Sequence, residues 1–306
     1  MQTDISAHLP SDFPDLKLIP LTQPKTGFRL FISSWLLHWD GHAILVDPGP
    51  SGTIPFLVSE LKKLGIQRLT GVLLTHIHID HAGGIGHLVK ALPTGWVMAH
   101  PKAHKHLIDP TRLWEGSCKV LGDLPQMYGP IDPVPPELIR FEDTLKVGDK
   151  IIRVLETPGH APHHISFIWS DYIFTGEAVG VGYQLPEALY LRPATPPRFI
   201  PEIFLASIER LLAQKDIPEY LCFGHFGAVA NARQQIQLGL EQTKLWIEVN
   251  QRMLGASLDE VITQLQAEDP RFALYPQLPK DVQERERYFV SNSIKGMQQF
   301  YQSVKV

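Results

Sequence analysis

Four residues of the kinds that bind metal ions lie close together in the sequence THIHIDH at positions 75–81. They are His76, His78, Asp80 and His81. Imidazole and carboxylate groups are ligands of zinc, and iron and manganese also accept them. Because four such groups in so short a segment cannot all point the same way, a turn there would direct some of them to one point and some to a neighbouring point. This arrangement suits two metal ions.

Three further candidate ligands follow apolar segments that predict strands. His160 ends the sequence TPGH after IIRVLE, Glu177 ends FTGE, and His225 lies in GHFG after YLCF. The segment LTGVLL, directly before 75–81, also predicts a short buried strand. In layered α/β folds, sites assemble where strands end, and each candidate ligand is expected at such a place.

The first half of the chain predicts alternating strands and helices. Two apolar runs within 16–48 are joined by Asp40-Gly41, a dipeptide typical of a tight hairpin turn. Residues 53–64 have helical spacing and end at Gly65, and residues 83–92 also suit a helix. A strand is expected at 95–99. A strand, a helix and a strand in order indicate a layered α/β protein.

The second half predicts more strands and then helices. Residues 109–136 are rich in proline and glycine and predict a long loop with one helix. Strands are expected at 150–156, 164–169, 172–176 and 220–224. Helices are expected at 199–213, after a proline-rich junction, and at 283–304. Ser257 with Glu260 fits a capping box that begins another helix.

Composition excludes several classes of protein. The chain has 306 residues, of which 44% are hydrophobic, and a net charge of −4, so it can form a full core and has no electrostatic basis for binding nucleic acid or a membrane surface. Its two cysteines, Cys118 and Cys222, exclude a disulfide framework. The first fifteen residues lack the pattern of a signal peptide, and no apolar run reaches the ~18–20 residues of a membrane helix. We therefore expect a cytoplasmic protein.

The ordered set HIHIDH, TPGH, FTGE and GH resembles the metallo-β-lactamase superfamily. The sequence VDPG at 46–49 resembles another of its signatures, and the resemblance spans about residues 28–227. It implies an αββα sandwich with a dinuclear metal site at one edge. The implied ligands are His76, His78 and His160 for one ion, and Asp80, His81 and His225 for the other.

The resemblance also implies roles around the two ions. Glu177 would bridge them, together with a water or hydroxide, although the usual residue of the family at this place is Asp. Asp47 is expected to hold a ligand histidine or its loop in place, and His164 is expected to support the ligands or the structure around them. Tyr183 is a candidate substrate-binding residue, and the alternative is that it only packs within its loop. Two divalent metal ions are expected. Zinc is the leading candidate, and iron and manganese are the alternatives.

The implied activity is that of a metal-dependent hydrolase. A metal-bound hydroxide would attack an ester, thioester or lactone, and Asp80 would orient it or carry its proton as the catalytic residue. Hydroxyacylglutathione hydrolases and acyl-homoserine lactonases are comparable members of the family. The alternative is an oxidoreductase similar to persulfide dioxygenases, with a single iron held by His76, His160 and Glu177.

Two parts are expected along the chain. Residues 1–194 and 218–230 would form the metallo-β-lactamase-like αββα domain, and residues 195–217 and 231–306 a helical extension that covers the site. The expected partner is a small-molecule substrate, with no nucleic acid and no membrane, and a homodimer is the alternative to a monomer.

Overall fold

The computed structural model describes residues 13, 15–186 and 188–304. The N-terminal stretch that argued against a signal peptide lies almost entirely outside them. The described residues form two compact units. The N-terminal unit contains residues up to Leu155 together with His163–Ser170, and the C-terminal unit contains Glu156–Pro162 and the chain from Asp171 onward. Within the described part of the chain, no helix is both long and apolar enough to cross a membrane.

The N-terminal unit is built on a six-stranded sheet in the order β1-β2-β3-β4-β5-β6. The first three strands are antiparallel neighbours, and β3 to β6 run parallel. Asp40 and Gly41 both have positive φ, 43° and 76°, as the expected turn between β2 and β3 requires. The strands are β1 (Leu16–Pro20), β2 (Ser33–Trp39), β3 (His42–Val46), β4 (Gly71–Leu73), β5 (Val97–Met98) and β6 (Ile139–Arg140).

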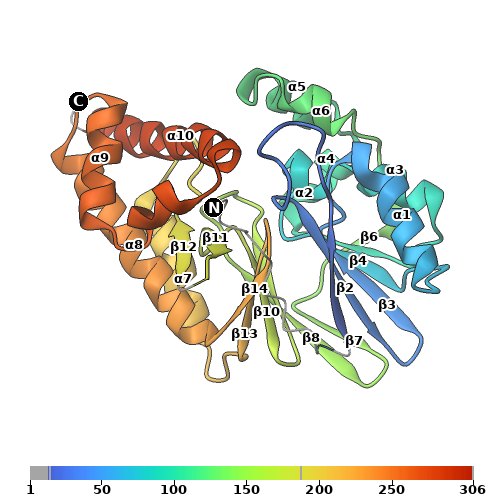
Figure 1. Ribbon diagram of the computed structural model, residues 1–306. Coiled ribbons are helices and arrows are strands. Elements are labelled where there is room, and N and C mark those ends of the chain that lie inside the picture. Colours follow the sequence, from blue (N-terminus) through green and yellow to red (C-terminus); the bar gives the residue numbers. More distant parts are fainter. Residues whose placement is uncertain (1–12, 14, 187, 305–306) are drawn as a thin grey trace. The chain divides into compact units, whose positions relative to one another are not determined.

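Helices accompany this sheet in the same unit, and α1 lies beside α3 (Figure 1). Helix α1 ends before Gly65, whose φ of 79° is the left-handed conformation of a helix stop. Strands β9, β8 and β7 follow one another in a second sheet. The elements are η1 (Ser51–Thr53), α1 (Ile54–Lys63), α2 (Ile79–Ala82), α3 (Ile85–Ala91), α4 (Pro101–Ile108), α5 (Thr111–Val120), α6 (Leu124–Tyr128), η2 (Pro136–Leu138), β7 (Thr144–Val147), β8 (Lys150–Glu156) and β9 (Ile165–Trp169).

The C-terminal unit combines five strands with four α-helices. Strands β14, β13 and β10 are neighbours, and β11 pairs with β12 in a separate hairpin. Helix α8 packs against α7, α9, α10 and β12, and Figure 1 shows α8 running beside β12. The elements are β10 (Tyr172–Gly176), β11 (Val181–Gln184), β12 (Leu189–Arg192), α7 (Pro201–Leu212), β13 (Tyr220–Phe223), β14 (Ala228–Ala230), α8 (Ala232–Arg252), α9 (Leu258–Glu268), η3 (Phe272–Gln277) and α10 (Lys280–Val304).

Most expected elements are present, one expectation was wrong, and some strands were not expected. Residues 109–136 hold two helices rather than one, because Pro110 and Pro125 lie at helix starts, where proline is tolerated. Strands β11, β12 and β14 were not expected, since each is short and the first follows glycine-rich sequence. The capping box of α9 is confirmed: Ser257 and Glu260 bond to each other's backbone.

A buried ion cluster joins β12 to α10 within the C-terminal unit. Glu286 is 0% exposed and accepts hydrogen bonds from Arg192, Arg285 and the Tyr190 hydroxyl. Burial raises the pKa of the Glu286 carboxyl, but the charges of Arg192 and Arg285 bring it below its usual value. The ionised carboxylate therefore contributes to the stability of the fold.

We expect Glu286→Gln to lower the free energy of unfolding at pH 7 by about 3–5 kcal/mol, because both guanidinium groups would stay buried without their anion. Urea denaturation measures this loss. Glu284→Gln is the matched control, since Glu284 is exposed on the same helix.

Comparison of the wild type with Glu286→Gln also tests how the stability of the fold depends on pH. Because the pKa of Glu286 is lower in the folded protein than the usual carboxyl value of 4.5, its charge stabilises the fold above pH 4.5. This stabilisation is lost as the pH falls below 4.5. The stability gap between the wild type and Glu286→Gln should therefore narrow between pH 5 and about pH 3. A gap that stays constant over this range would show that the cluster does not depend on the Glu286 charge.

Candidate metal centre

The ends of β3 and β4 bring Asp47 and Thr75 together in the N-terminal unit. The two strands are parallel neighbours, so their carboxyl ends share one edge of the sheet. Asp47 has a φ of 51° and its backbone nitrogen donates to the Leu73 carbonyl. The Asp47 carboxylate accepts from the Thr75 nitrogen at 2.8 Å and from the Thr75 hydroxyl at 2.6 Å. These bonds fix the start of the histidine-rich loop.

Asp47 also contacts the last histidine of that loop. His81 lies in α2, and its Nδ1 atom is 3.4 Å from Asp47 Oδ2. Its Nε2 atom is 3.6 Å from Asp80 Oδ2. The backbone of Gly49 donates to the His81 carbonyl, which ties the helix to the segment after β3. The fully buried His81 ring therefore lies between two carboxylates.

Hydrogen bonding selects the tautomer of His76. The Thr75 hydroxyl donates its only proton to Asp47, so towards His76 Nδ1, 3.1 Å away, it acts as an acceptor. The Nδ1 atom of His76 consequently carries the ring proton. In the neutral ring, Nε2 then keeps its lone pair, as a metal ligand must.

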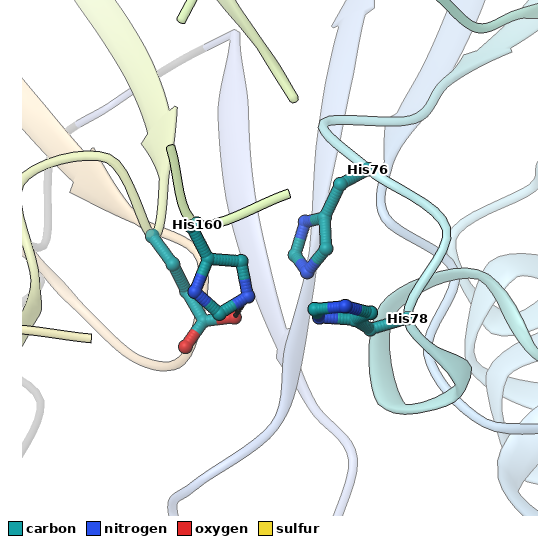
Figure 2. Close-up of side chains that lie close together, drawn as sticks. His76, His78 and His160 are labelled. Atoms are coloured by element: carbon teal, nitrogen blue, oxygen red, sulfur yellow. Dashed lines mark ion pairs between the residues drawn. The ribbon is translucent and has the colours of Figure 1, made fainter. Parts of the chain in front are cut away.

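Three histidine rings of the N-terminal unit, those of His78, His81 and His164, pack against His76. The rings of His76 and His78 meet edge to face with centroids 4.7 Å apart, as Figure 2 shows. His164, which is 0% exposed, stacks on His76 with centroids 5.2 Å apart. We call His76, His78, Asp80 and His81 the N-terminal cluster.

Two glycines allow Glu177 and His225 to approach each other in the C-terminal unit. Strands β10 and β13 are parallel neighbours, and the Gly224 nitrogen donates to the Gly176 carbonyl. A Cβ atom on Gly224 would lie 2.9 Å from the backbone of Gly176. Only glycine fits at this contact, and the next residue of each strand end is a candidate ligand.

Glu177 lies between two imidazole rings. Its Oε2 atom is 2.9 Å from His160 Nε2, and its Oε1 atom is 3.0 Å from His225 Nε2. Burial raises the pKa of the Glu177 carboxyl, but His160 and His225 hold it well below its usual value. We call His160, Glu177 and His225 the C-terminal cluster.

Sequence reasoning missed the groups that position His160. A Cβ atom on Gly159, whose φ is 143°, would lie 2.7 Å from the Phe204 Cα atom, so α7 packs directly on this loop. The Ser207 hydroxyl donates to the Pro158 carbonyl. The His160 Nδ1 atom is 2.7 Å from the Ala194 carbonyl oxygen. A backbone carbonyl carries no side-chain signal in a sequence, whereas Gly159 is visible within TPGH.

The contacts of His160 show that the C-terminal cluster fits a cation. A carbonyl oxygen only accepts, so Nδ1 of His160 donates to Ala194 and only Nε2 is left to face Glu177. A nitrogen so close to a carboxylate is stabilised by a proton or by a metal cation shared between the two groups. Two ligand atoms about 2.0–2.2 Å from a tetrahedral zinc ion are about 3.3–3.6 Å apart, so the distances of 2.9 and 3.0 Å around Glu177 need only a small outward movement to admit an ion.

Tyr183 lies in β11 and is 1% exposed. Its ring stacks on Tyr190, and the guanidinium carbon of Arg285 is 5.1 Å from the ring centroid. Burial raises the pKa of the Tyr183 hydroxyl, so it stays protonated. These contacts are those of a packed side chain, and substrate binding by Tyr183 stays a prediction.

Comparison with known sequences identifies the family. Residues 27–225 match the family described as the metallo-β-lactamase superfamily, and this segment contains every residue of both clusters. The chain belongs to the metallo-β-lactamase superfamily. The resemblance of its histidine, glycine and carboxylate motifs is thereby confirmed.

Two relatives are similar to this chain over about two thirds of its length. A metallo-β-lactamase fold-containing protein of Sulfurisphaera tokodaii is 28% identical over 214 residues, which cover 68% of this chain and 77% of that protein. A hydroxyacylglutathione hydrolase of Xylella fastidiosa is 31% identical over 214 residues. The match covers 69% of this chain and 65% of the hydrolase, so the chain spans about two thirds of that relative.

Solved structures of metallo-β-lactamase superfamily proteins confirm the expected fold. An archaeal member from Sulfolobus tokodaii has a TM-score of 0.67 at 21% identity, over 92% of this chain and 98% of that one. A member from Thermus thermophilus has a TM-score of 0.63 at 23% identity, over 96% and 95%. The chain is a hydrolase of the metallo-β-lactamase fold, a family that uses divalent metal ions, typically zinc.

Proposed function

We propose that the chain hydrolyses an ester, thioester or lactone at a dinuclear metal centre. In this proposal His76, His78 and His160 bind one ion, Asp80, His81 and His225 bind the second, and Glu177 bridges them. The observation that carries the proposal is the Glu177 carboxylate, whose two oxygens each face one imidazole Nε2 atom. Each oxygen atom of this carboxylate would then bind a different ion.

The tautomers of two histidines support this assignment. His76 and His160 come from different units, yet each has Nδ1 bonded to an oxygen that acts as an acceptor. Each therefore offers Nε2 as the ligand atom, and a metal ion would take the place of any proton on that nitrogen. We propose that His164 keeps the His76 ring in place by stacking and that Asp47 orients His81.

Two divalent ions, when bound, would acidify a water molecule and polarise the carbonyl group of the substrate. The residues of the chain would then orient the reactants. We propose that Asp80 accepts a hydrogen bond from the attacking water through one carboxylate oxygen and carries its proton towards the leaving group. His81 Nε2 lies 3.6 Å from Asp80 Oδ2, a separation at which both atoms could bind the same ion.

A thioester is the first substrate class to test. The hydroxyacylglutathione hydrolase of Xylella fastidiosa is 31% identical to this chain over 214 residues. We propose a small-molecule substrate, a cytoplasmic location, and a covering role for residues 195–217 and 231–306. Helices α7, α8, α9 and α10 lie within these residues.

The experiment is a substrate panel with protein purified without chelator. Acyl thioesters of glutathione, acyl-homoserine lactones and simple carboxylic esters are compared under the same conditions. We expect hydrolysis in at least one class, abolished by a chelator and restored by Zn²⁺. Thiol-dependent oxygen uptake with bound iron, and no hydrolysis of any class, would contradict the proposal.

A further inference from the structure

Helix α10 runs alongside the segment that follows β12. Glu286 binds Arg192, Ser293 contacts Pro193 and Thr195, and Gly296 lies against Pro196. Ten residues of a helix span about 15 Å, and four steps of extended chain span about 13–14 Å. The helix and the segment 192–196 therefore run in the same direction and in register.

A single hydroxyl group holds the backbone on both sides of Ala194. The Ser293 Oγ atom donates to the Pro193 carbonyl at 3.4 Å and accepts from the Thr195 nitrogen at 3.4 Å. The Thr195 hydroxyl lies 3.5 Å from the Ser293 carbonyl. All these atoms are buried. The peptide groups next to Ala194 are thus fixed by one residue of α10.

Gly296 brings the helix close enough for these contacts. A Cβ atom at this position would lie 2.4 Å from the Pro196 carbonyl oxygen and 3.3 Å from the Pro197 Cα atom. Both neighbours are backbone atoms, so any larger residue must displace the segment or the helix. Because Pro193, Pro196 and Pro197 have fixed φ angles, a displacement is carried along the segment and is not absorbed by local bending.

The Ala194 carbonyl connects this contact to the C-terminal cluster. It accepts the Nδ1 proton of His160 at 2.7 Å, and His160 Nε2 lies 2.9 Å from Glu177. A shift of Ala194 would lengthen the Nδ1 bond and release the ring from the orientation in which Nε2 faces Glu177. Partners of this kind orient ligand histidines and tune their affinity.

We infer that Ser293 and Gly296 of α10 are positioning residues that hold the His160 ring in its ligand orientation through the Ala194 carbonyl. The link to metal binding rests on the proposed function, which assigns His160 as a ligand. The C-terminal helix α10 then helps to orient a metal ligand of the site, although it lies more than a hundred residues from His160 along the sequence.

The test compares Gly296→Ala and Ser293→Ala with two matched controls. Ser291→Ala removes a hydroxyl of the same helix that donates to the Arg287 carbonyl one turn earlier. Gly116→Ala adds a methyl group to helix α5 where nothing lies within 4 Å of it. The first readout is the Nδ1–H group of His160 in metal-free protein, whose hydrogen bond to Ala194 should slow exchange of its proton with water, observed in proton–nitrogen correlation spectra of ¹⁵N-labelled histidine. His160→Gln identifies the signal.

We expect a slowly exchanging Nδ1–H signal of His160 in the wild type and both controls, and loss of that signal in Ser293→Ala and Gly296→Ala. The second readout is Zn²⁺ affinity by competition with a chelator. It should fall about 10–100-fold in Gly296→Ala, and less in Ser293→Ala, which keeps the close helix contact.

Two results separate this inference from the proposed function. If Ser293→Ala and Gly296→Ala lower thermal stability but keep the wild-type Nδ1–H signal of His160, α10 has a structural role only and the inference is wrong. If the wild type binds no Zn²⁺, the proposed function fails, and the Nδ1–H signal still decides whether α10 positions His160. Ser293→Ala adds no atoms, so it remains informative should Gly296→Ala fail to fold.

Discussion

Glu177→Gln is expected to lose the second metal ion and most of the hydrolytic activity while keeping its fold. The bridging carboxylate offsets the repulsion between two dications, which increases steeply at short distance. An amide of the same shape removes that charge and leaves one oxygen instead of two. We expect the affinity for the second ion to fall at least about 100-fold, with turnover falling in parallel. Metal content after dialysis and far-ultraviolet circular dichroism measure the two outcomes.

Two further variants, Glu177→Asp and the exposed control Glu202→Gln, test the bridging role of Glu177 more closely. Glu177→Asp restores the residue that is usual in the family, but its carboxylate is one methylene shorter. Because the backbone at Gly176 and Gly224 is fixed by close contact, the shorter side chain should fail to reach both His160 and His225, and metal or activity should fall. Glu202→Gln, exposed on α7, should change nothing. Two tightly bound ions and full hydrolysis in Glu177→Gln would refute the bridging role.

Asp47→Asn is expected to impair both stability and metal binding. The Asp47 carboxylate accepts from the Thr75 nitrogen and hydroxyl and faces His81 Nδ1. An amide has one accepting oxygen, so at least one of these buried donors loses its acceptor. We expect a loss of about 1–3 kcal/mol in the free energy of unfolding and a loss of about 10–100-fold in metal affinity. Urea denaturation and chelator competition measure these quantities.

Asp40→Asn is a closely matched control for this prediction. Asp40 also has a positive φ, 43° against 51° at Asp47, but its side chain is exposed in the hairpin turn between β2 and β3. The same substitution there should leave stability and metal affinity unchanged. Equal effects at Asp40 and Asp47 would mean that the backbone conformation, and not the hydrogen bonds of the carboxylate, causes the loss.

Local signals made much of the fold predictable from the sequence. The Asp40-Gly41 turn, the stop of α1 at Gly65 and the capping box at Ser257 each depend on neighbouring residues, and the structure has all three. The hairpin of β11 and β12 was missed because its strands pair mainly with each other and lie in a glycine-rich segment. The helices α5 and α6 show that proline marks a helix start as well as a loop.

The candidate ligands were also accessible from the sequence, because they are side chains of distinctive type at strand ends. The groups that hold these side chains in position could not be predicted from the sequence. Ala194 acts through its backbone carbonyl, and Ser293 reaches Thr195 across almost a hundred residues. Such contacts depend on the tertiary packing of α10, which neither composition nor periodicity encodes.

Anomalous diffraction from a crystal of the zinc-loaded protein tests the dinuclear centre most directly. We predict two anomalous peaks about 3.5–4 Å apart, one bound by His76, His78 and His160 and the other by Asp80, His81 and His225. The Glu177 carboxylate should contact both ions. A single peak, or two peaks with His81 or His225 bound to neither, would contradict the account.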